Sequence, residues 1–345
     1  MGTLAGMSIV VTPLPATDEV GARHAFDIRS RSDAADLPDF PPVDPRHFFA
    51  SLSDPWPGEH KANALAWLDD VPVGFLEMSL PFLENTGTAD LRLDVLPEVR
   101  RRGVGGALLD YAEQTARADG RKHLIGTTVC TLAGGPERPT DGDEFARARG
   151  AQLALTDVRR RLTIESLDRP SLDAMVEAAW PHAAGYSLVR WLGAVPDDYV
   201  ADIAYLEGRL MSDAPLGDLA LEGQKIDEAR FREQEAARER RGRRVYTTAA
   251  RHDATGRIVA LTAIDFAESI DWHSWQQITL VDPDHRGHRL GALVKVENLT
   301  TVLASEPALR VIDTWNAAVN SHMIAINEAM GFRPVDEWHN WQISL

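Results

Sequence analysis

The chain has 345 residues, of which 44% are hydrophobic, and this length and apolar content predict two domains with separate cores. Fifty-two acidic against 36 basic residues give a formal net charge of −16. This charge argues against nucleic acid or an anionic membrane as a partner, because both bind basic surfaces. The single cysteine, Cys130, excludes an intramolecular disulfide and a cysteine-based zinc site.

No apolar run approaches the roughly 20 residues that span a bilayer. Residues 1–20 lack the basic and apolar regions of a signal peptide. We therefore expect a cytoplasmic protein that binds no metal.

The first half of the chain predicts three strands followed by a helix. Residues 63–68 and 71–80 form two apolar runs around an Asp-Asp turn, a pattern typical of an antiparallel pair. A third strand ends at Val95, and a turn rich in arginine and glycine then leads into an amphipathic helix. A strand over residues 122–129 and a helix closed by Gly150 follow. Cys130 comes directly after that strand, and we interpret it as a buried structural thiol rather than a nucleophile.

The middle of the chain, residues 171–244, has no counterpart in the first half and reads as helical. Helices are predicted over residues 171–180, 197–211 and 227–244, with Ser171 and Asp197 as N-caps. The last of these is either a basic recognition helix or a solvated helix, and its alternating charges favour the second. We place the domain boundary just before this segment, giving domains 1–166 and 167–345.

The second half repeats the first at a spacing of 281 − 95 = 186 residues. Strands are predicted over residues 245–252 and 258–266, with a third ending at Val281 and a fourth over residues 311–315. The repeat matches Val95 with Val281, Pro97 with Pro283, Arg100 with Arg286 and Gly105 with Gly291. A repeat this long indicates a duplicated domain rather than a solenoid. The order β-β-β-α-β-α-β predicts an α/β (α+β) fold in which helices pack on a mixed sheet.

Each turn between the third strand and its helix has the features of an anion-binding site. Glycines let the backbone approach a ligand, and the helix start offers unpaired N–H groups at the positive end of its dipole. Such a turn suits a pyrophosphate. Neither copy is a Walker loop, because no GxxxxGK[ST] is present, and neither matches GxGxxG after the first strand of a βαβ unit.

Both turns resemble the acetyl-CoA-binding motif of GNAT-type N-acetyltransferases, which is roughly V-x-P-x-x-[QR]-x-x-G-x-[GA]. The chain as a whole is similar to the two-domain actinobacterial branch that includes mycothiol synthase. This resemblance implies two tandem domains, each with a mostly antiparallel sheet, and a helical insert at the start of the second. It also implies that turn amides bind the CoA pyrophosphate and that a bulged strand amide binds the acetyl carbonyl. That strand is expected to splay from the next one and admit the pantetheine.

By this resemblance, Val281 offers its N–H to the thioester carbonyl and Asn320 contacts the pantetheine or ribose side of CoA. The full set of cofactor-binding residues expected in the second domain is Leu280, Val281, Arg286, Gly287, His288, Arg289, Leu290, Gly291, Asn316, Asn320 and Asn327. The matching set in the first domain is Val95, Arg100, Arg101, Arg102, Gly103, Val104 and Gly105.

The two halves depart from the family pattern in different ways. The first keeps its turn glycines, but Ala146 stands where a tyrosine is usual. The second has Arg289 in place of a glycine and Asn327 at the tyrosine position, where an amide cannot act as a phenol-like acid. The first half has no residue equivalent to Asn320. We therefore expect the second half to be catalytic and the first to be degenerate.

The catalytic base is the least defined part of the predicted site. Gln276 and Gln277 occupy the region of the usual glutamate and cannot take a proton. The nearby candidates are His273 and Asp271, with Asp265 as a further carboxylate. For the acceptor we expect Tyr186, Arg190 and Asp198, and ordinary packing between the domains is the alternative interpretation of these three residues.

The sequence thus predicts an acetyl-CoA-dependent N-acetyltransferase that transfers its acetyl group directly to a primary amine of a small molecule, as a monomer or homodimer. A non-catalytic acyl-CoA-binding or regulatory protein is the alternative, supported by the missing glutamate and tyrosine. A third hypothesis, a peptide or protein acetyltransferase, requires an open acidic groove.

Overall fold

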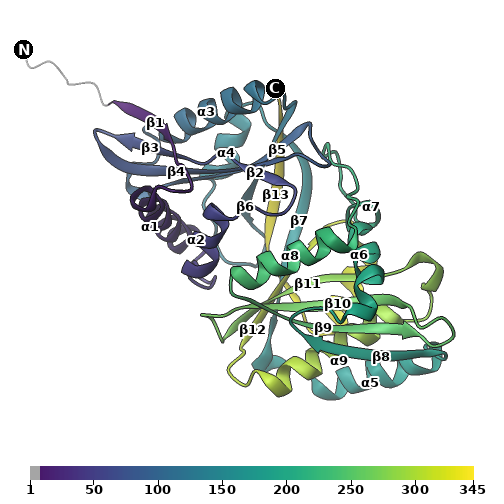
Figure 1. Ribbon diagram of the computed structural model, residues 1–345. Helices are drawn as coiled ribbons and strands as arrows, with labels where there is room; N and C mark the ends of the chain where they lie inside the picture. The colour runs from purple at the N-terminus through teal and green to yellow at the C-terminus, as the bar shows by residue number, and fades with distance from the viewer. Residues whose placement is uncertain (1–7) are drawn as a thin grey trace, which may run out of the picture.

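One mixed sheet of 13 strands runs through the computed structural model, which describes residues 8–345 (Figure 1). The strands follow the order β1-β3-β4-β5-β6-β13-β7-β12-β11-β10-β9-β8, and β2 pairs with β4. They are β1 (Ile9–Pro13), β2 (Glu59–Lys61), β3 (Ala64–Leu68), β4 (Val71–Pro81), β5 (Thr88–Val95), β6 (His123–Thr131), β7 (Gln152–Thr163), β8 (Tyr186–Leu192), β9 (Arg243–His252), β10 (Ile258–Ala267), β11 (His273–Val281), β12 (Val311–Ala317) and β13 (Arg333–Ser344).

Ten α-helices in the described residues flank this sheet. They are α1 (Glu19–Asp36), α2 (Pro45–Ser53), α3 (Val104–Ala118), α4 (Asp141–Ala148), α5 (Arg169–Ala179), α6 (Val200–Gly208), α7 (Leu210–Asp213), α8 (Glu228–Arg240), α9 (Leu290–Ser305) and α10 (Ser321–Ala329). Among residues 8–345, none of them combines the length and the hydropathy that a membrane-spanning helix needs. Residues 1–7, where the signal-peptide prediction begins, lie outside the described part of the chain.

The sheet has an approximate twofold arrangement in which the two halves exchange their last strands. All neighbouring pairs are antiparallel except β5–β6 and β11–β12, which occupy corresponding places in the two halves. Strand β7, from the first half, pairs with β12, and β13, from the second half, pairs with β6. Figure 1 shows β13 running into the first unit, with the C-terminus beside α3. Neither half of the chain therefore completes its sheet alone.

The predicted fold class is confirmed, with the repeated order β-β-β-α-β-α-β present as β3 to β7 and as β9 to β13. The predicted boundary at residues 166/167 falls between the 3-10 turn Ile164–Ser166 and α5, and remains a prediction because the strand exchange crosses it. Two N-cap predictions are wrong. Asp168 rather than Ser171 caps α5, and Asp197 begins the 3-10 turn Asp197–Tyr199 without a side-chain cap.

The segment 171–244 contains a strand that the helical prediction missed. Residues Tyr186–Leu192 form β8, the edge strand beside β9. Helix α8 follows as expected, capped by Asp227, whose carboxylate accepts a hydrogen bond from the Arg230 N–H at 2.8 Å.

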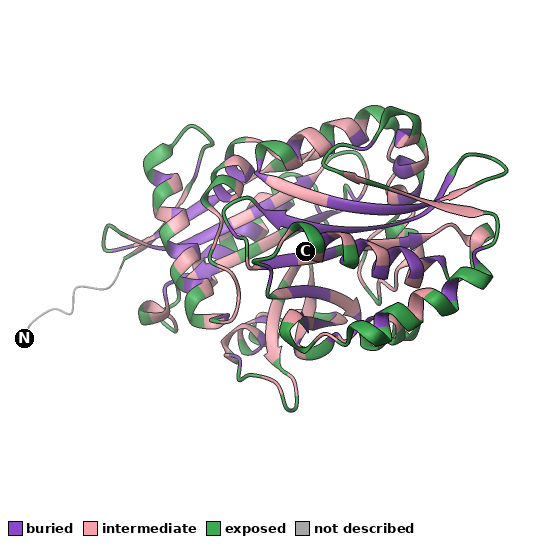
Figure 2. Ribbon diagram, turned by 90° about the horizontal axis from the view of Figure 1, so that it is seen from below, coloured by how far each residue is buried: buried purple, intermediate pink, exposed green. Residues whose placement is uncertain are grey.

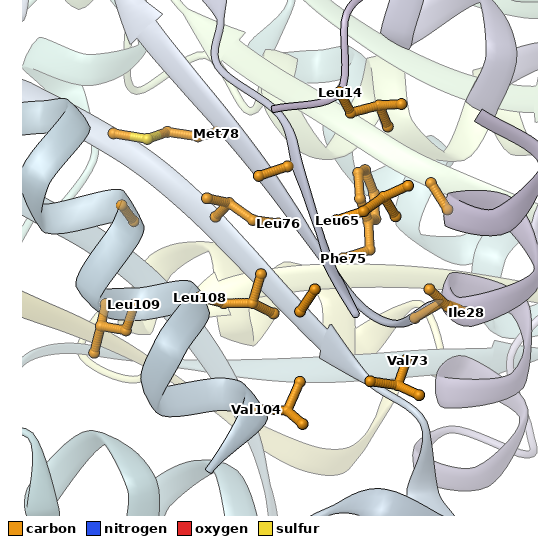
Figure 3. Close-up of a cluster of buried hydrophobic side chains, with 14 of the residues drawn as sticks. Leu14, Ile28, Leu65, Val73, Phe75, Leu76, Met78, Val104, Leu108 and Leu109 are labelled. Carbon is orange, nitrogen blue, oxygen red and sulfur yellow. The ribbon is translucent and has the colours of Figure 1, made fainter. Parts of the chain in front are cut away.

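The core of the first unit packs helices on both faces of the sheet, as Figure 3 shows. Successive residues of β4 point to opposite faces. Phe75 therefore contacts Phe48 of α2, while a Cβ on Gly74 would lie 2.9 Å from Val104 of α3. The burial pattern in Figure 2 follows this layering, with buried residues along the strands and exposed residues on the outer helix faces.

A buried ionic cluster joins the exchanged strands at the centre of the sheet. Arg159 of β7 is fully buried and donates to Asp336 of β13 at 2.8 and 2.6 Å and to Asp313 of β12 at 3.0 Å. A third carboxylate, Asp39, accepts at 3.0 Å, and the ring of Phe40 lies 4.4 Å from the guanidinium carbon. This arginine thus neutralises carboxylates from both halves of the chain.

Candidate functional site

Each parallel strand pair opens into a cleft. Strands β5 and β6 are paired only from Thr88↔His123 to Leu91↔Gly126, and β11 and β12 only from His273↔Val311 to Trp275↔Asp313. Beyond these pairs the strands separate. We call the cavity between residues 91–95 and 126–129 the N-cleft, and the cavity between residues 276–281 and 314–317 the C-cleft. Their volumes are about 710 and 1030 Å³.

A turn with unpaired amides lies at the mouth of each cleft. The N-caps of α1, α2, α5, α8 and α10 all have side chains that accept a hydrogen bond from the first helical turn. Helices α4, α6 and α7 have no such side-chain cap. Helices α3 and α9, which begin at Val104 and Leu290, also have none. Their first N–H groups therefore remain available to an anion at the positive end of the helix dipole.

Both turns use two left-handed residues, one glycine and one arginine, in opposite order. In the first turn Arg101 has φ 63° and Gly103 has φ 92°. In the second Gly287 has φ 86° and Arg289 has φ 54°. Left-handed backbone is unfavourable for a residue with a Cβ. The replacement of one turn glycine by arginine thus preserves the backbone shape, because each half keeps its glycine at the other position.

The first arginine of each turn connects the end of the preceding strand to an aspartate on a neighbouring helix. Arg100 donates Nε–H to the Val95 carbonyl at 3.1 Å and forms an ion pair with Asp36 at 2.7 Å. Arg286 repeats this arrangement, with Val281 at 3.3 Å and Asp213 at 2.9 Å. Their side chains therefore fix the end of the strand, while the main chain of the turn faces the cleft mouth.

The two clefts differ in the strand that forms their wall. Strand β11 has a bulge, because its register with β10 shifts from Thr262↔Thr279 to Ile264↔Gln276. Gln276 fills the irregularity by donating its side-chain amide to the Ala263 carbonyl at 2.9 Å. The corresponding pairing of β4 with β5 is regular from Gly74↔Val95 to Ser79↔Asp90. Only the C-cleft wall, of the two, therefore has a bulged strand.

Backbone donors near the end of β11 point into the C-cleft. Asp282 donates its N–H to the Val259 carbonyl at 2.8 Å. Antiparallel pairing alternates between residues bonded to the partner strand and residues whose N–H points away from it. The N–H groups of Val281 and Thr279 therefore point away from β10, toward the opening left by β12. Val281 was expected from the sequence, whereas Thr279 was not.

Two ionisable residues of the C-cleft have apolar counterparts in the N-cleft. Lys295 of α9 and Asp157 of β7 both line the C-cleft. Leu109 lies 186 positions before Lys295 and lines the N-cleft. Asp157 is paired with Ala317, and the corresponding position of the first unit, paired with Val129, is Trp338. The C-cleft thus has an acid and a base where the N-cleft has hydrocarbon and indole.

Comparison with known proteins gives concordant results. The model of the acetyltransferase (GNAT) family matches residues 31–133. A solved structure of a tandem GNAT protein from the clavulanic acid biosynthesis pathway is 33% identical, with 98% of each chain covered and a TM-score of 0.84. The chain belongs to the GNAT acetyltransferase family, in its tandem form. It is therefore an acyltransferase by family.

More distant structures share the fold alone. A GCN5-related N-acetyltransferase from Sphaerobacter thermophilus is 12% identical, covering 97% of this chain and 95% of that one, with a TM-score of 0.61. The N-myristoyltransferase of Saccharomyces cerevisiae, solved with bound myristoyl-CoA, is 11% identical, covering 100% and 81%, with a TM-score of 0.59. Curated protein sequences gave no match.

Most residues assigned by the GNAT motif lie together. Those that line the C-cleft are Leu280, Val281, Arg286, Gly287, Arg289, Leu290, Gly291, Asn316, Asn320 and Asn327. Those that line the N-cleft are Val95, Arg100, Arg101, Gly103, Val104 and Gly105. His288 and Arg102 lie outside the clefts, and His288 contacts the His182 carbonyl at 2.9 Å. Asn320 caps α10 by accepting from the Met323 N–H at 3.3 Å.

The residues expected as bases lie at the closed end of the strand pair. His273 is 2% exposed, with Nε2 3.0 Å from Asp313, and burial lowers its pKa. Asp271 is exposed in the loop before β11. Asp265 is buried against Arg243 at 2.8 Å. None of the three lines the C-cleft, because β11 starts at the paired end and the cleft opens at the other.

The residues expected to bind the acceptor also lie outside both clefts. Tyr186 and Arg190 are on the edge strand β8, where they contact His285 at 2.8 Å and Glu297 at 2.6 Å. Asp198 is exposed in the turn before α6. Within the segment expected to be helical, the part that carries Tyr186 and Arg190 is instead the outer border of the sheet, whereas α5, α6, α7 and α8 are helical as predicted.

The thiol of Cys130 is poorly suited to nucleophilic attack. It lies 3.2 Å from His339 Nδ1, and burial together with the Asp143 carboxylate raises its pKa to about 12. Since the thiolate is the nucleophile, such a thiol is unreactive near neutral pH.

Proposed function

We propose that this GNAT protein transfers the acetyl group of acetyl-CoA to a primary amine of a small molecule, and that the reaction takes place in the C-cleft. The observation that carries the proposal is the bulge of β11 beside the strand opening, which β5 lacks. It lies on the strand whose Thr279 and Val281 N–H groups face a cavity large enough for the pantetheine arm.

The C-cleft has the parts that a CoA thioester requires. The uncapped amides of α9 and the basic side chain of Arg289 face the diphosphate position. Gly291 leaves the entrance to the cleft open. A Cβ at this position would lie 3.5 Å from Val281, and a larger side chain would enter the cleft. The N–H groups of Thr279 and Val281 then stabilise the negative charge that develops on the thioester oxygen during attack.

Asp157 acts as the general base in place of the glutamate that β11 does not have. Burial raises the pKa of its carboxyl, and the amide of Asn340 donates to it at 2.8 Å. No ion pair engages Asp157 among the described residues. A carboxylate in this position attracts an ammonium group and takes the proton that the amine loses on attack. It reaches the C-cleft only because β7 is exchanged between the halves.

The test is thiol release from acetyl-CoA in the presence of a panel of primary amines. We expect turnover with at least one small amine, and Asp157→Asn should lower kcat by about 10²- to 10³-fold because the amide cannot accept the proton. Asp253→Asn, which makes the same change at an exposed turn residue, serves as the control. Calorimetric binding of acetyl-CoA without any turnover would instead support a non-catalytic acyl-CoA-binding protein.

A further inference from the structure

The C-cleft buries an amino group for which residues 8–345 provide no hydrogen-bond or ion-pair partner. Lys295 lies one helical turn after Gly291 on α9, and its side chain is 1% exposed. Among the described residues it forms no hydrogen bond or ion pair, and the ring of Phe332 is 5.8 Å from Nζ. A buried ammonium without a counter-ion is costly. Burial alone lowers the pKa of Lys295 to about 7.

No other titratable group of the cleft is paired with this lysine. Those that line the same cavity are Asp157 from β7, Asp213 from α7, His285, Arg286 and Arg289 from the turn, and His322 from α10. Asp213 is engaged by Arg286 and Arg209 at 2.9 Å each. Lys295 therefore exchanges its proton with the contents of the cleft rather than with a protein partner.

Lys295 and the position at which the family pattern has its tyrosine line the same cleft. Asn327 occupies that position, is fully buried, and donates from its amide to Asn316 at 2.6 Å. The main-chain carbonyl of Asn327 accepts from the Phe332 N–H at 2.9 Å, and Phe332 is the ring that faces Lys295. Phe332 thus connects the position of the missing phenol with the unpaired amine.

Packing does not explain the lysine. The matching position of the N-cleft is Leu109, which is 2% exposed, so hydrocarbon satisfies the same place in the fold. A lysine that costs stability in the C-cleft and is absent from the N-cleft points to chemistry in the C-cleft.

We propose that Lys295 is the catalytic residue that protonates the CoA sulfur as it leaves, a proposal that rests on the function proposed above. The acceptor nitrogen forms a bond to the acetyl carbon, and the C–S bond breaks with its electron pair on sulfur. The Lys295 ammonium gives one proton to that sulfur, which produces free CoA thiol and a neutral amine. The acceptor's proton goes to Asp157, and solvent returns each group to its starting state.

The test compares Lys295→Met with Lys122→Met, which makes the same change at an exposed lysine outside both clefts. Acetyl-CoA affinity, thermal unfolding and the pH dependence of kcat are measured for each, with an acceptor whose own pKa lies outside the scanned range. We expect K295M to bind acetyl-CoA like the wild type and to lose about 10²-fold in kcat. The wild-type kcat should fall as pH rises past neutrality, since the donor must be protonated, and K295M should lose this alkaline limb.

Three results would overturn the assignment. One is K295M with wild-type kcat and an unchanged pH profile while the wild type is active. Another is mass-spectrometric detection of an acetylated Lys295 that passes its acetyl group to the amine, which would make the residue a nucleophile. Absence of wild-type turnover with every amine would refute the proposed function itself, and the role of Lys295 with it.

Discussion

Gly291→Glu is expected to lower kcat/KM for acetyl transfer by at least about 100-fold, which corresponds to about 2.7 kcal/mol of transition-state stabilisation. A Cβ at this position already contacts Val281 and approaches Ile326. The rest of a glutamate side chain therefore enters the C-cleft, where its charge repels the diphosphate. Steady-state kinetics with a saturating amine measures the change.

The matched variant is Gly105→Glu, which places the same group in the N-cleft beside Phe145. It should reduce the number of acetyl-CoA molecules bound per chain while changing turnover far less than G291E. If G105E abolishes activity and G291E does not, catalysis occurs in the first unit and our choice of cleft is wrong.

Arg159→Met is expected to lower the free energy of unfolding by about 3–5 kcal/mol at neutral pH, because it leaves carboxylates buried without their partner. Asp313 and Asp336 are both fully buried and share this guanidinium. Chemical denaturation of the wild type, R159M and the exposed control Arg310→Met measures the loss. A loss in R159M no larger than that of R310M would contradict the stabilising role of the cluster.

From the same cluster we expect a specific pH dependence of the free energy of unfolding. Two arginines and His273 hold the pKa of Asp313 at about 2, below its value in an unfolded chain near 3.9. A depressed carboxyl pKa contributes stability that is complete above the unfolded pKa and is lost as pH falls through the folded pKa. The wild type should therefore lose this contribution between about pH 4 and pH 2. In R159M the loss should begin at higher pH, since Asp313 has lost one cation.

The repeat made much of the fold predictable. Its spacing aligns Val95 with Val281, and this one match located both strand-turn-helix units, while the resemblance to the GNAT motif predicted the cleft beside the strand. Local sequence patterns predicted the secondary structure less well where a segment pairs with a strand that is distant in sequence. Residues 186–192 read as part of a helical region, although pairing with β9 makes them an edge strand.

The strand exchange explains why the base proposed here could not be found from the sequence. Asp157 belongs to the first half of the chain, far from β11 in sequence, and only the pairing of β7 with β12 brings it to the C-cleft. His273 was the nearest imidazole in sequence, but the cleft opens at the opposite end of its strand. Sequence distance was therefore a poor guide to distance in the site.

Lys295 did leave a signal that sequence analysis overlooked. It interrupts the apolar run Leu293-Val294-Lys295-Val296 within a helix, and the repeat has Leu109 at its place. The bulge in β11 left no comparable signal, because it depends on the register between two strands.

A crystal structure of the protein with saturating acetyl-CoA would show which cleft binds the cofactor. We expect acetyl-CoA in the C-cleft, with the diphosphate on the amides at the start of α9 and the thioester oxygen within hydrogen-bond distance of the Thr279 or Val281 N–H. Acetyl-CoA bound in the N-cleft alone, with the C-cleft empty at the same saturating concentration, would contradict this expectation.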